Sequence, residues 1–303
     1  MGNIISKNGT TYFAPELVTE MFNLVKGHST IARLANQTPI PFTGSEIMTF
    51  SMDHEVSIVG ENAAKVNGGG TLGSISILPI KFEYGLRVSD EFMYASEERQ
   101  LTFLQAFMEG FSRKLGRGID IASFHGFNPY SGTASSVVGT NHFDSAITAG
   151  NTVTFAAATA DDNLESAIQK VTDAENEVTG IAMAPAFAAA MAALKTDDKY
   201  SRYPEFKFGG KPATFAGMDC DINPTVAFNS NNDRVIVGDF QNAFKWGYSK
   251  EIPLKVIEYG CPDNDATAGD LQGHNQVYLR SEAYVGWGIL DAAAFAKVAA
   301  SNG

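Results

Sequence analysis

The chain has 303 residues, of which 44% are hydrophobic and 18% are charged, against about 25% charged residues in an average soluble domain. So low a charge content favours a surface that is partly covered, and another copy of the same chain is the simplest cover. The formal net charge is −12, and no cluster of Lys and Arg along the sequence indicates a surface that grips phosphates. The composition disfavours a dedicated nucleic-acid-binding protein but allows one that encloses nucleic acid without binding it tightly.

Neither secretion nor membrane insertion is indicated. Residues 1–7 lack the apolar core of a signal peptide, and no segment approaches the ~18 consecutive apolar residues of a membrane span. Cys220 and Cys261 do not have a metal-ligand or redox spacing. The sequence leaves their pairing open, and we expect free thiols made in a reducing cytoplasm.

The first elements in chain order are an arm and a ribbon. Residues 1–44 are predicted to form an arm, because a short amphipathic stretch is followed by prolines that impose an extended exit. Apolar and polar residues then alternate at 48–53 and again at 80–89, as is typical of half-buried strands. With the polar, glycine-rich tip 59–70 between them, these segments predict a long two-stranded ribbon. Such a ribbon must lie on the chain's body or on a neighbour, since alone it is marginally stable.

A long helix is predicted next. Ser89, Asp90 and Glu91 are expected to open it, with acids that complement the helix dipole. It is expected to end near His125. Its apolar residues recur at steps of three and four and form a continuous stripe: Leu101, Leu104, Met108, Phe111 and Leu115.

Shorter elements follow from about residue 133. Asp162 and Glu165 are interpreted as a capping pair for one helix, and Pro185 is expected to start another that ends at Leu194. An Ala-rich helix from Asp291 is expected to close the chain. Strands are predicted at 180–183, 206–208, 222–228, 234–238, 253–259 and 275–287.

Motifs typical of enzymes and metal sites are absent or in the wrong context. Gly68–Gly73 matches the dinucleotide fingerprint GxGxxG, but a strand rather than a helix is predicted after it. The sequence Asp53–Glu55 is interpreted as a solvated strand edge. Asp263, Asp265 and Asp270 resemble a calcium loop only superficially, because the series of ligands is broken. We therefore expect no catalytic residue, no cofactor-binding residue, no cofactor and no metal site.

Several short motifs follow one another in a distinctive order and spacing. Val88-Ser89-Asp90-Glu91 precedes the long helix, which ends in His125-Gly126-Phe127, and Gly238-Asp239-Phe240 comes later. Asn275 to Glu282 and Ala294-Phe295 complete the series. In this order and spacing the chain resembles the major capsid proteins of tailed bacteriophages, whose shell fold is named after phage Hong Kong 97 and is shared with encapsulins.

The resemblance implies an α+β fold of the Hong Kong 97-like capsid type with four parts. These are an N-terminal arm at 1–44, an extended loop at 45–86, a peripheral domain at 87–132 and 256–303, and an axial domain at 133–255. Some relatives carry a scaffolding segment ahead of the arm. Met1 stands almost directly before the arm here, so scaffolding is expected to be separate or absent, unless the chain has been trimmed.

The same resemblance implies a function. The chain is expected to be a structural major capsid protein that self-assembles into hexamers and pentamers of an icosahedral phage head enclosing double-stranded DNA. Portal and scaffolding or protease proteins are its expected partners, and assembly is expected in the bacterial host cytoplasm. An encapsulin-like compartment shell is one alternative. A soluble α+β enzyme or binding protein with an unrecognised site is another.

The ribbon tip is the candidate subunit contact, because it contributes few large apolar side chains and many glycines to its own subunit. The candidate contact residues are Val59, Glu61, Lys65, Val66 and Leu72. Some relatives join a loop-tip Lys covalently to an Asn of a neighbouring subunit. Lys65 lies near this tip, but no Asn matches the partner, so we expect a shell held without covalent links.

Overall fold

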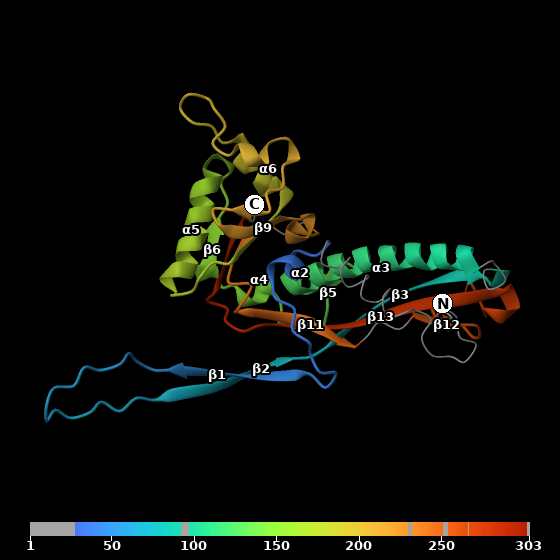
Figure 1. The fold of residues 1–303 in the computed structure, drawn as a ribbon, viewed down its shortest axis with the longest axis horizontal. Helices are drawn as coiled ribbons and strands as arrows, with labels where there is room; N and C mark the ends of the chain where they lie inside the picture. Colours follow the sequence, from blue (N-terminus) through green and yellow to red (C-terminus); the bar gives the residue numbers. More distant parts are fainter. Residues whose placement is uncertain (1–27, 92–96, 230–231, 251–253, 266, 302–303) are drawn as a thin grey trace.

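The computed structural model describes residues 28–91, 97–229, 232–250, 254–265 and 267–301. Figure 1 shows three parts: a projecting two-stranded ribbon, an elongated sheet with one long helix beside it, and a compact lobe of helices around a second sheet. The predicted amphipathic stretch of the arm, at 17–25, lies outside the described residues. None of the described helices combines the length and the apolar character needed to cross a membrane.

The elongated sheet is organised around one long strand, β13 (Gln276–Ile289). β3 (Ile80–Ser89) pairs with it antiparallel, from Gln276↔Ser89 to Val285↔Ile80. β12 (Leu254–Ile257) and β11 (Phe244–Lys250) pair with successive parts of β13, also antiparallel. The predicted strand at 275–287 is therefore confirmed, and it is the strand that holds this sheet together.

Helix α3 (Glu97–His125) runs along the elongated sheet (Figure 1). Its predicted end at His125 is confirmed, whereas the predicted start is too early, because Ser89 still belongs to β3. Leu104, Met108 and Phe111 of the predicted stripe are buried. The side chain of Leu101 lies outside the described residues. The buried stripe packs into a core shared with β3 and β13, which explains its spacing of three and four.

The compact lobe is built on a six-stranded sheet in the order β6-β14-β10-β7-β9-β8. Its strands are β6 (Thr152–Thr154), β7 (Gly180–Met183), β8 (Thr214–Phe215), β9 (Met218–Ile222), β10 (Asp233–Gly238) and β14 (Phe295–Ala299). Helices α5 (Ala160–Asp173) and α6 (Pro185–Ala193) pack on it through a second core. The predicted strands at 180–183 and 234–238 are confirmed.

The ribbon consists of β1 (Ser45–Met52) and β2 (Gly70–Ile77), paired antiparallel from Ser45↔Ile77 to Met52↔Gly70. The predicted ribbon is thus right in its first strand and wrong in its second. The alternating segment at 80–89 pairs with β13 instead, because there its apolar residues Ile80, Phe82, Leu86 and Val88 pack, half-buried, against the core that α3 shares with the sheet. Part of the glycine-rich stretch assigned to the tip opens β2.

Smaller elements connect these parts. They are α2 (Thr30–Leu34), α4 (Phe143–Ala146), the hairpin β4 (Phe127–Asn128) with β5 (Thr133–Ala134), and the 3₁₀ turns Ala149–Asn151, Ala157–Thr159, Pro204–Gly209, Pro224–Ala227 and Gln272–His274. Two predicted strands are wrong here. Residues 206–208 belong to a 3₁₀ turn, and 222–228 holds only the end of β9 before another 3₁₀ turn.

Two helix predictions also need correction. Helix α5 begins at Ala160, so Asp162 lies in its first turn rather than at a cap. The Ala-rich C-terminal segment is the strand β14, parallel to β6 and antiparallel to β10. Ala has a high helix propensity, but here the burial of side chains outweighs it. As a strand between β10 and β6, the segment buries Phe295 and Val298 fully.

The domain boundaries taken from the resemblance stay predictions. Strand pairing assigns two segments differently from those boundaries. β11, within the predicted axial domain, belongs to the elongated sheet, and β14, within the predicted peripheral domain, belongs to the sheet of the compact lobe.

Candidate functional site

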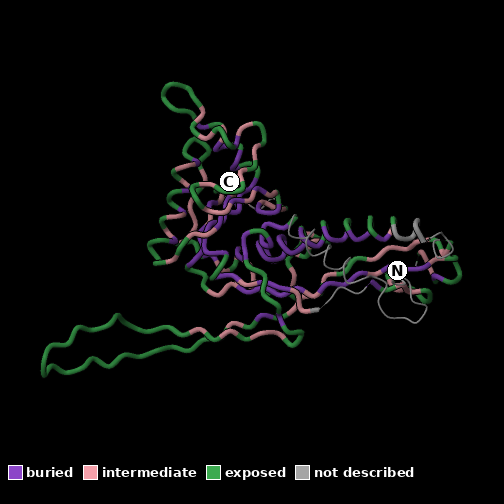
Figure 2. Tube along the Cα trace, in the orientation of Figure 1, coloured by how far each residue is buried: buried purple, intermediate pink, exposed green. Residues whose placement is uncertain are grey.

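The ribbon has one apolar face, and that face is in solvent. Residues directly opposite each other in an antiparallel pair lie on the same side, which places Phe50 and Leu72 together, with Met48 and Met52 on the same side along β1. The exposed fractions of Met48, Phe50, Met52 and Leu72 are 68%, 63%, 74% and 62%. We call these four residues the apolar ribbon face. Figure 2 shows that the outer ribbon is exposed along its length.

The opposite side of the ribbon is polar in its outer part. Thr49 pairs with Gly73, and Ser51 pairs with Thr71. An isolated hairpin with one wet apolar face is at best marginally stable in water. The unequal faces therefore point to a binding surface rather than to a solvent-facing decoration.

The tip, residues 53–69, contains four of the five candidate contact residues, and Leu72 lies on β2. All five are exposed: Val59, Glu61, Lys65, Val66 and Leu72. Their role in subunit contacts stays a prediction. Val56 and Ile58 are 90% and 99% exposed and were not among the candidates. Their signal is in the sequence, because they continue the even-numbered apolar series that begins at Met48.

Hydrogen bonds across the tip explain the Asp53–Glu55 cluster. The carboxylate of Asp53 accepts a hydrogen bond from the N–H of Gly69, with an N···O distance of 2.9 Å. The ring nitrogens of His54 lie 2.8 and 3.3 Å from the carbonyl oxygens of Glu55 and Asn67. These two carbonyls hold the pKa of His54 above its ordinary value. The cluster thus ties the two sides of the tip together.

The base of the ribbon is seated against β13. Ile77 is buried and lies over Gly286 and Gly288. A Cβ atom at Gly288 would lie 2.7 Å from Cγ1 of Ile77, and one at Gly286 would lie 3.1 Å from Cδ1 of Ile40. Both distances are too short for ordinary packing, so the two glycines make room for the base. Only the base is supported by its own subunit, and the outer ribbon projects away (Figure 1).

A buried carboxylate, Asp120 on α3, holds the segment that leads into the ribbon. It accepts hydrogen bonds from the hydroxyl of Ser29 at 2.6 Å and from the N–H groups of Thr30 and Ile31 at 2.9 and 3.2 Å. Thr225 and Asn223 donate at 3.0 and 3.4 Å. Burial raises the pKa of Asp120 to about 6, although these hydrogen bonds act in the opposite direction.

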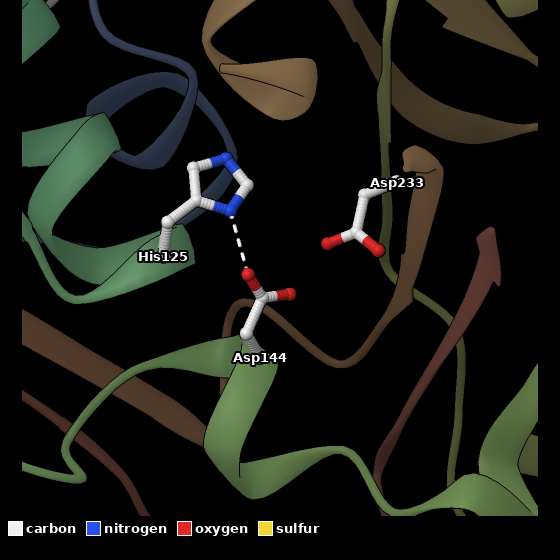
Figure 3. A group of neighbouring side chains, drawn as sticks. All are labelled: His125, Asp144 and Asp233. Atoms are coloured by element: carbon white, nitrogen blue, oxygen red, sulfur yellow. Dashed lines mark hydrogen bonds and ion pairs between the residues drawn. The ribbon is translucent and has the colours of Figure 1, made fainter. Parts of the chain in front are cut away.

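Figure 3 shows a second buried polar group, made of His125, Asp144 and Asp233. Their ligand atoms lie within 4.8 Å of one another, a spacing that could hold a metal ion. Nδ1 of His125 lies 2.8 Å from Asp144. The ammonium group of Lys297 on β14 lies 2.7 Å from Asp144 and 3.1 Å from Asp233. A protein cation therefore already lies between the two carboxylates and offsets part of their negative charge.

The electrostatics of this group follow from that arrangement. Burial opposes ionisation of Asp144, but hydrogen bonds and the charges of His125 and Lys297 hold its pKa below the ordinary value. Burial, together with the neighbouring Asp144, raises the pKa of Asp233. The four residues come from α3, α4, β10 and β14, so only the fold brings them together. The expected absence of a metal stays a prediction.

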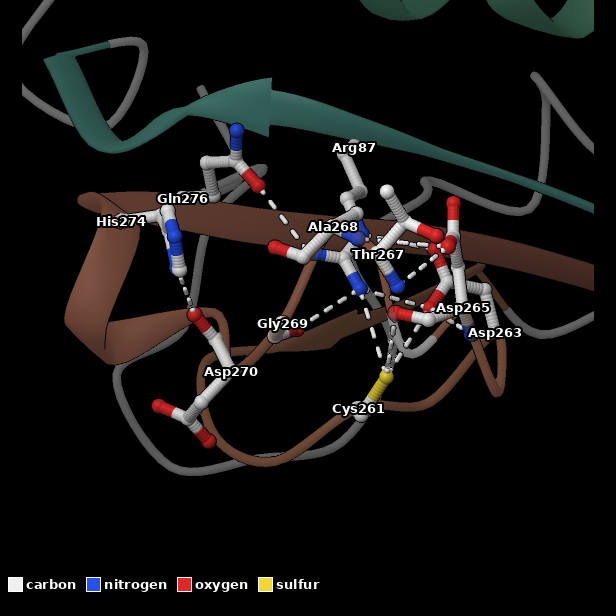
Figure 4. Close-up of polar contacts among 10 residues, drawn as sticks. All are labelled: Arg87, Cys261, Asp263, Asp265, Thr267, Ala268, Gly269, Asp270, His274 and Gln276. Carbon is white, nitrogen blue, oxygen red and sulfur yellow. Dashed lines mark hydrogen bonds and ion pairs between the residues drawn. The ribbon is translucent and has the colours of Figure 1, made fainter.

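Figure 4 shows why the loop with Asp263, Asp265 and Asp270 differs from a calcium loop. Asp263 forms a two-point ion pair with Arg87, with both N···O distances at 2.7 Å. This pair lowers the pKa of Asp263. Asp265 accepts hydrogen bonds from the N–H groups of Thr267 and Ala268. Asp263 thus holds the loop against β3, whereas Asp265 fixes the backbone of the loop itself. Cys261 in this loop and the buried Cys220 are both free thiols.

The fold and these surfaces define a structural protein with a projecting, one-sided ribbon. A family model described as the phage capsid family matches residues 9–300, and the chain belongs to this family. It is a structural major capsid protein of the bacteriophage virion, where it forms part of the capsid shell. This confirms the resemblance, the fold class and the role of a structural major capsid protein that the resemblance implied.

Solved structures agree with the family. A chain from Mycobacterium phage Ogopogo is 32% identical, with a TM-score of 0.77, over 90% of this chain and 92% of that one. A chain from Gordonia phage Cozz is 26% identical, with a TM-score of 0.75, over 91% and 87%. The capsid of a native GTA particle shares the fold, with 15% identity and a TM-score of 0.66 over 90% of each chain. A comparison with curated proteins found no match.

Proposed function

We propose that the chain assembles into hexamers and pentamers of an icosahedral head around double-stranded DNA, and that its apolar ribbon face lies across a neighbouring subunit. The observation that carries this proposal is the exposure of Met48, Phe50, Met52 and Leu72 on one side of a ribbon that its own subunit supports only at the base. Taking a large apolar side chain fully out of water contributes about 1.5–3 kcal/mol. A contact between unlike surfaces, repeated around a ring, closes rings of subunits.

The proposal includes the remaining roles that the resemblance implies. The protein acts without catalysis and without a cofactor, it is assembled in the host cytoplasm, and it meets portal and scaffolding or protease proteins during head assembly. Membership in a capsid family supports a structural role. The net charge of −12 fits a shell that encloses DNA without reading its sequence.

The test is a face-specific variant with a matched control. Replacing Met48, Phe50, Met52 and Leu72 together by Thr keeps residues that suit a strand but removes the apolar face. We expect a subunit that melts like the wild type and forms no closed particles by light scattering and negative-stain microscopy. The control carries Thr49→Val, Ser51→Thr and Thr71→Val on the polar face, and it should still assemble. Closed particles from the apolar-face variant would refute the proposed role of this face.

The content of the same particles separates the proposal from an encapsulin-like compartment. Wild-type particles are expected to release double-stranded DNA after heating, which a nuclease protection assay detects. Particles that hold a cargo protein and no DNA would favour the compartment instead.

A further inference from the structure

Cations from separate parts of the sequence meet in one cleft. The cleft has a volume of about 680 Å³, and its lining includes Arg33, Arg113, Arg117 and Lys211, with Asp221 as its single carboxylate. Arg33 precedes the ribbon, Arg113 and Arg117 lie on α3, and Lys211 lies between the 3₁₀ turn Pro204–Gly209 and β8. Arg113 and Arg117 are close in sequence, but Arg33 and Lys211 are far from them, so the sequence alone does not show that these four cations share one cleft. In a chain with a net charge of −12, so many positive charges in one cleft indicate a binding site for an anion.

The carboxylate of the cleft is already paired. Asp221 lies 2.7 Å from Nη1 of Arg33 and also accepts a hydrogen bond from the hydroxyl of Thr30 at 2.6 Å. Within the described part of the chain, Arg113, Arg117 and Lys211 form no ion pair. These three side chains are exposed. The cleft therefore keeps three hydrated positive charges that are free to meet an anion.

The three cations are also well placed for an extended anion. Arg113 and Arg117 are one helical turn apart on α3, about 6 Å along the axis. The guanidinium of Arg117 lies over the ring of Phe228, 5.4 Å from its centroid, which holds it in place while its N–H groups stay available. Guanidinium groups match the geometry of phosphate oxygens, and Lys adds a point charge.

We propose that this cleft binds the phosphate backbone of the enclosed nucleic acid without reading its sequence. The inference rests on the proposed function, since it names a contact for the DNA that the shell would hold. Only Ile222 and Pro224 of the ten lining residues are apolar. The core of an interface between proteins is depleted in charge and rich in aromatic residues, whereas interfaces with nucleic acid are polar and positively charged. The lining therefore favours phosphate over a second copy of this chain.

The test uses the full-length, unassembled protein and a fluorescein-labelled DNA duplex of random sequence, followed by anisotropy across a salt series. The cleft variant is Arg113→Gln with Lys211→Gln, which leaves Arg117 over Phe228. The control, Lys195→Gln with Lys199→Gln, removes the same charge from exposed positions outside the cleft. Each lost phosphate contact should reduce the slope of log K against log salt by about 0.9, so we expect a reduction of about 2 for the cleft variant. The control should keep the wild-type slope.

A single Arg113→Gln variant should reduce the slope by about 1, and equal melting temperatures would show that all variants are folded. Wild-type protein that does not bind the duplex, or a cleft variant with the wild-type slope, would overturn the inference. A cleft variant that keeps the slope but no longer forms particles would assign the cleft to a neighbouring copy and would also overturn it. If wild-type particles form and contain DNA, such results leave the proposed function intact. Wild-type particles that lack DNA would contradict the proposed function itself.

Discussion

At the scale of single residues, Asp120 shows how a charge is buried without an ion pair to any cation of the described residues. The five groups that donate to it are two hydroxyls, two backbone N–H groups and the side-chain amide of Asn223, and all are neutral. Three of these donors belong to Ser29, Thr30 and Ile31, at the start of α2. One carboxylate therefore attaches the segment before the ribbon to α3.

An Asp120→Asn substitution tests that role. The new amide group would point hydrogens at groups that also donate, and a buried donor left without an acceptor costs about 1–3 kcal/mol. We expect the free energy of unfolding to fall by about 2 kcal/mol or more, measured by urea denaturation of the unassembled subunit. Asp198→Asn, at an exposed position, is the matched control and should change little. Equal losses in both variants would show that the network around Asp120 contributes nothing special.

The buried group of His125, Asp144, Asp233 and Lys297 makes the stability of the subunit depend on pH with a definite sign. In the folded subunit the pKa of Asp233 is raised to about 7, by burial and then by Asp144. The folded state thus holds a proton that the unfolded chain releases near the ordinary carboxyl pKa of about 4. The stabilisation from this proton is complete below that ordinary value and is lost as the pH rises through about 7.

We therefore expect the stability of the wild type relative to Asp233→Asn to increase as the pH is lowered from about 8 to 5. The comparison isolates Asp233, because His125, His142, Asp144 and Lys297, which surround it, are present in both proteins. Urea denaturation of unassembled subunits at several pH values measures the difference. A difference that stays constant over this range would contradict the assignment of the proton to Asp233.

At the scale of elements, the periodicity of apolar residues predicted whether a segment is a helix or a strand better than it predicted the strand that pairs with that segment. Alternation at 48–53 and 275–287 and the stripe on α3 identified two strands and a helix correctly, because each reports which side of that segment is buried. The alternation at 80–89 carried no information about its partner, and β13 rather than β1 is that partner. The helix predicted for the Ala-rich C-terminal segment was wrong for a similar reason, since the strands beside that segment, β10 and β6, are distant in sequence.

The candidate site shows the same limit. Exposed apolar residues of β1 follow a visible pattern of alternate positions, so the first strand of the ribbon could be predicted, but its partner β2 could not. The group around Lys297 and the cationic cleft each combine several segments, and the short basic cluster of Arg113, Lys114 and Arg117 does not show which other segments join it. Neither could be foreseen before the fold was known.

The register of the ribbon defines the ends of a tip deletion more closely than its sequence does. Because Met52 pairs with Gly70, an Asn-Gly dipeptide in place of residues 53–69 should close β1 and β2 as a two-residue hairpin. We expect a soluble subunit with a cooperative thermal melt, since these residues are exposed, but one that no longer forms particles. Light scattering and a melt on the same preparation test both halves. A variant that still assembles would show that the tip is dispensable.

At the scale of the whole molecule, two separate hydrophobic cores stabilise different parts of the subunit. One lies between α3 and the elongated sheet and extends toward α2 and α4, and the other fills the compact lobe between its sheet and helices α5 and α6. The ribbon adds little to either beyond the residues at its base. The body can therefore be stable while the ribbon remains available for a neighbour.

The order of strands along the chain has a consequence for how the subunit is made. The last two described strands are the ones that join each sheet: β13 pairs with β3, β11 and β12, and β14 links β6 to β10. A ribosome releases the chain from its N-terminus, so β3 and β6 wait for partners that are synthesised about 200 and 145 residues later. Neither sheet can be completed before β13 and β14 have been synthesised. A chain that stops before β13 lacks the strands that join both sheets, so we expect it to form no folded body that could carry its ribbon into a shell.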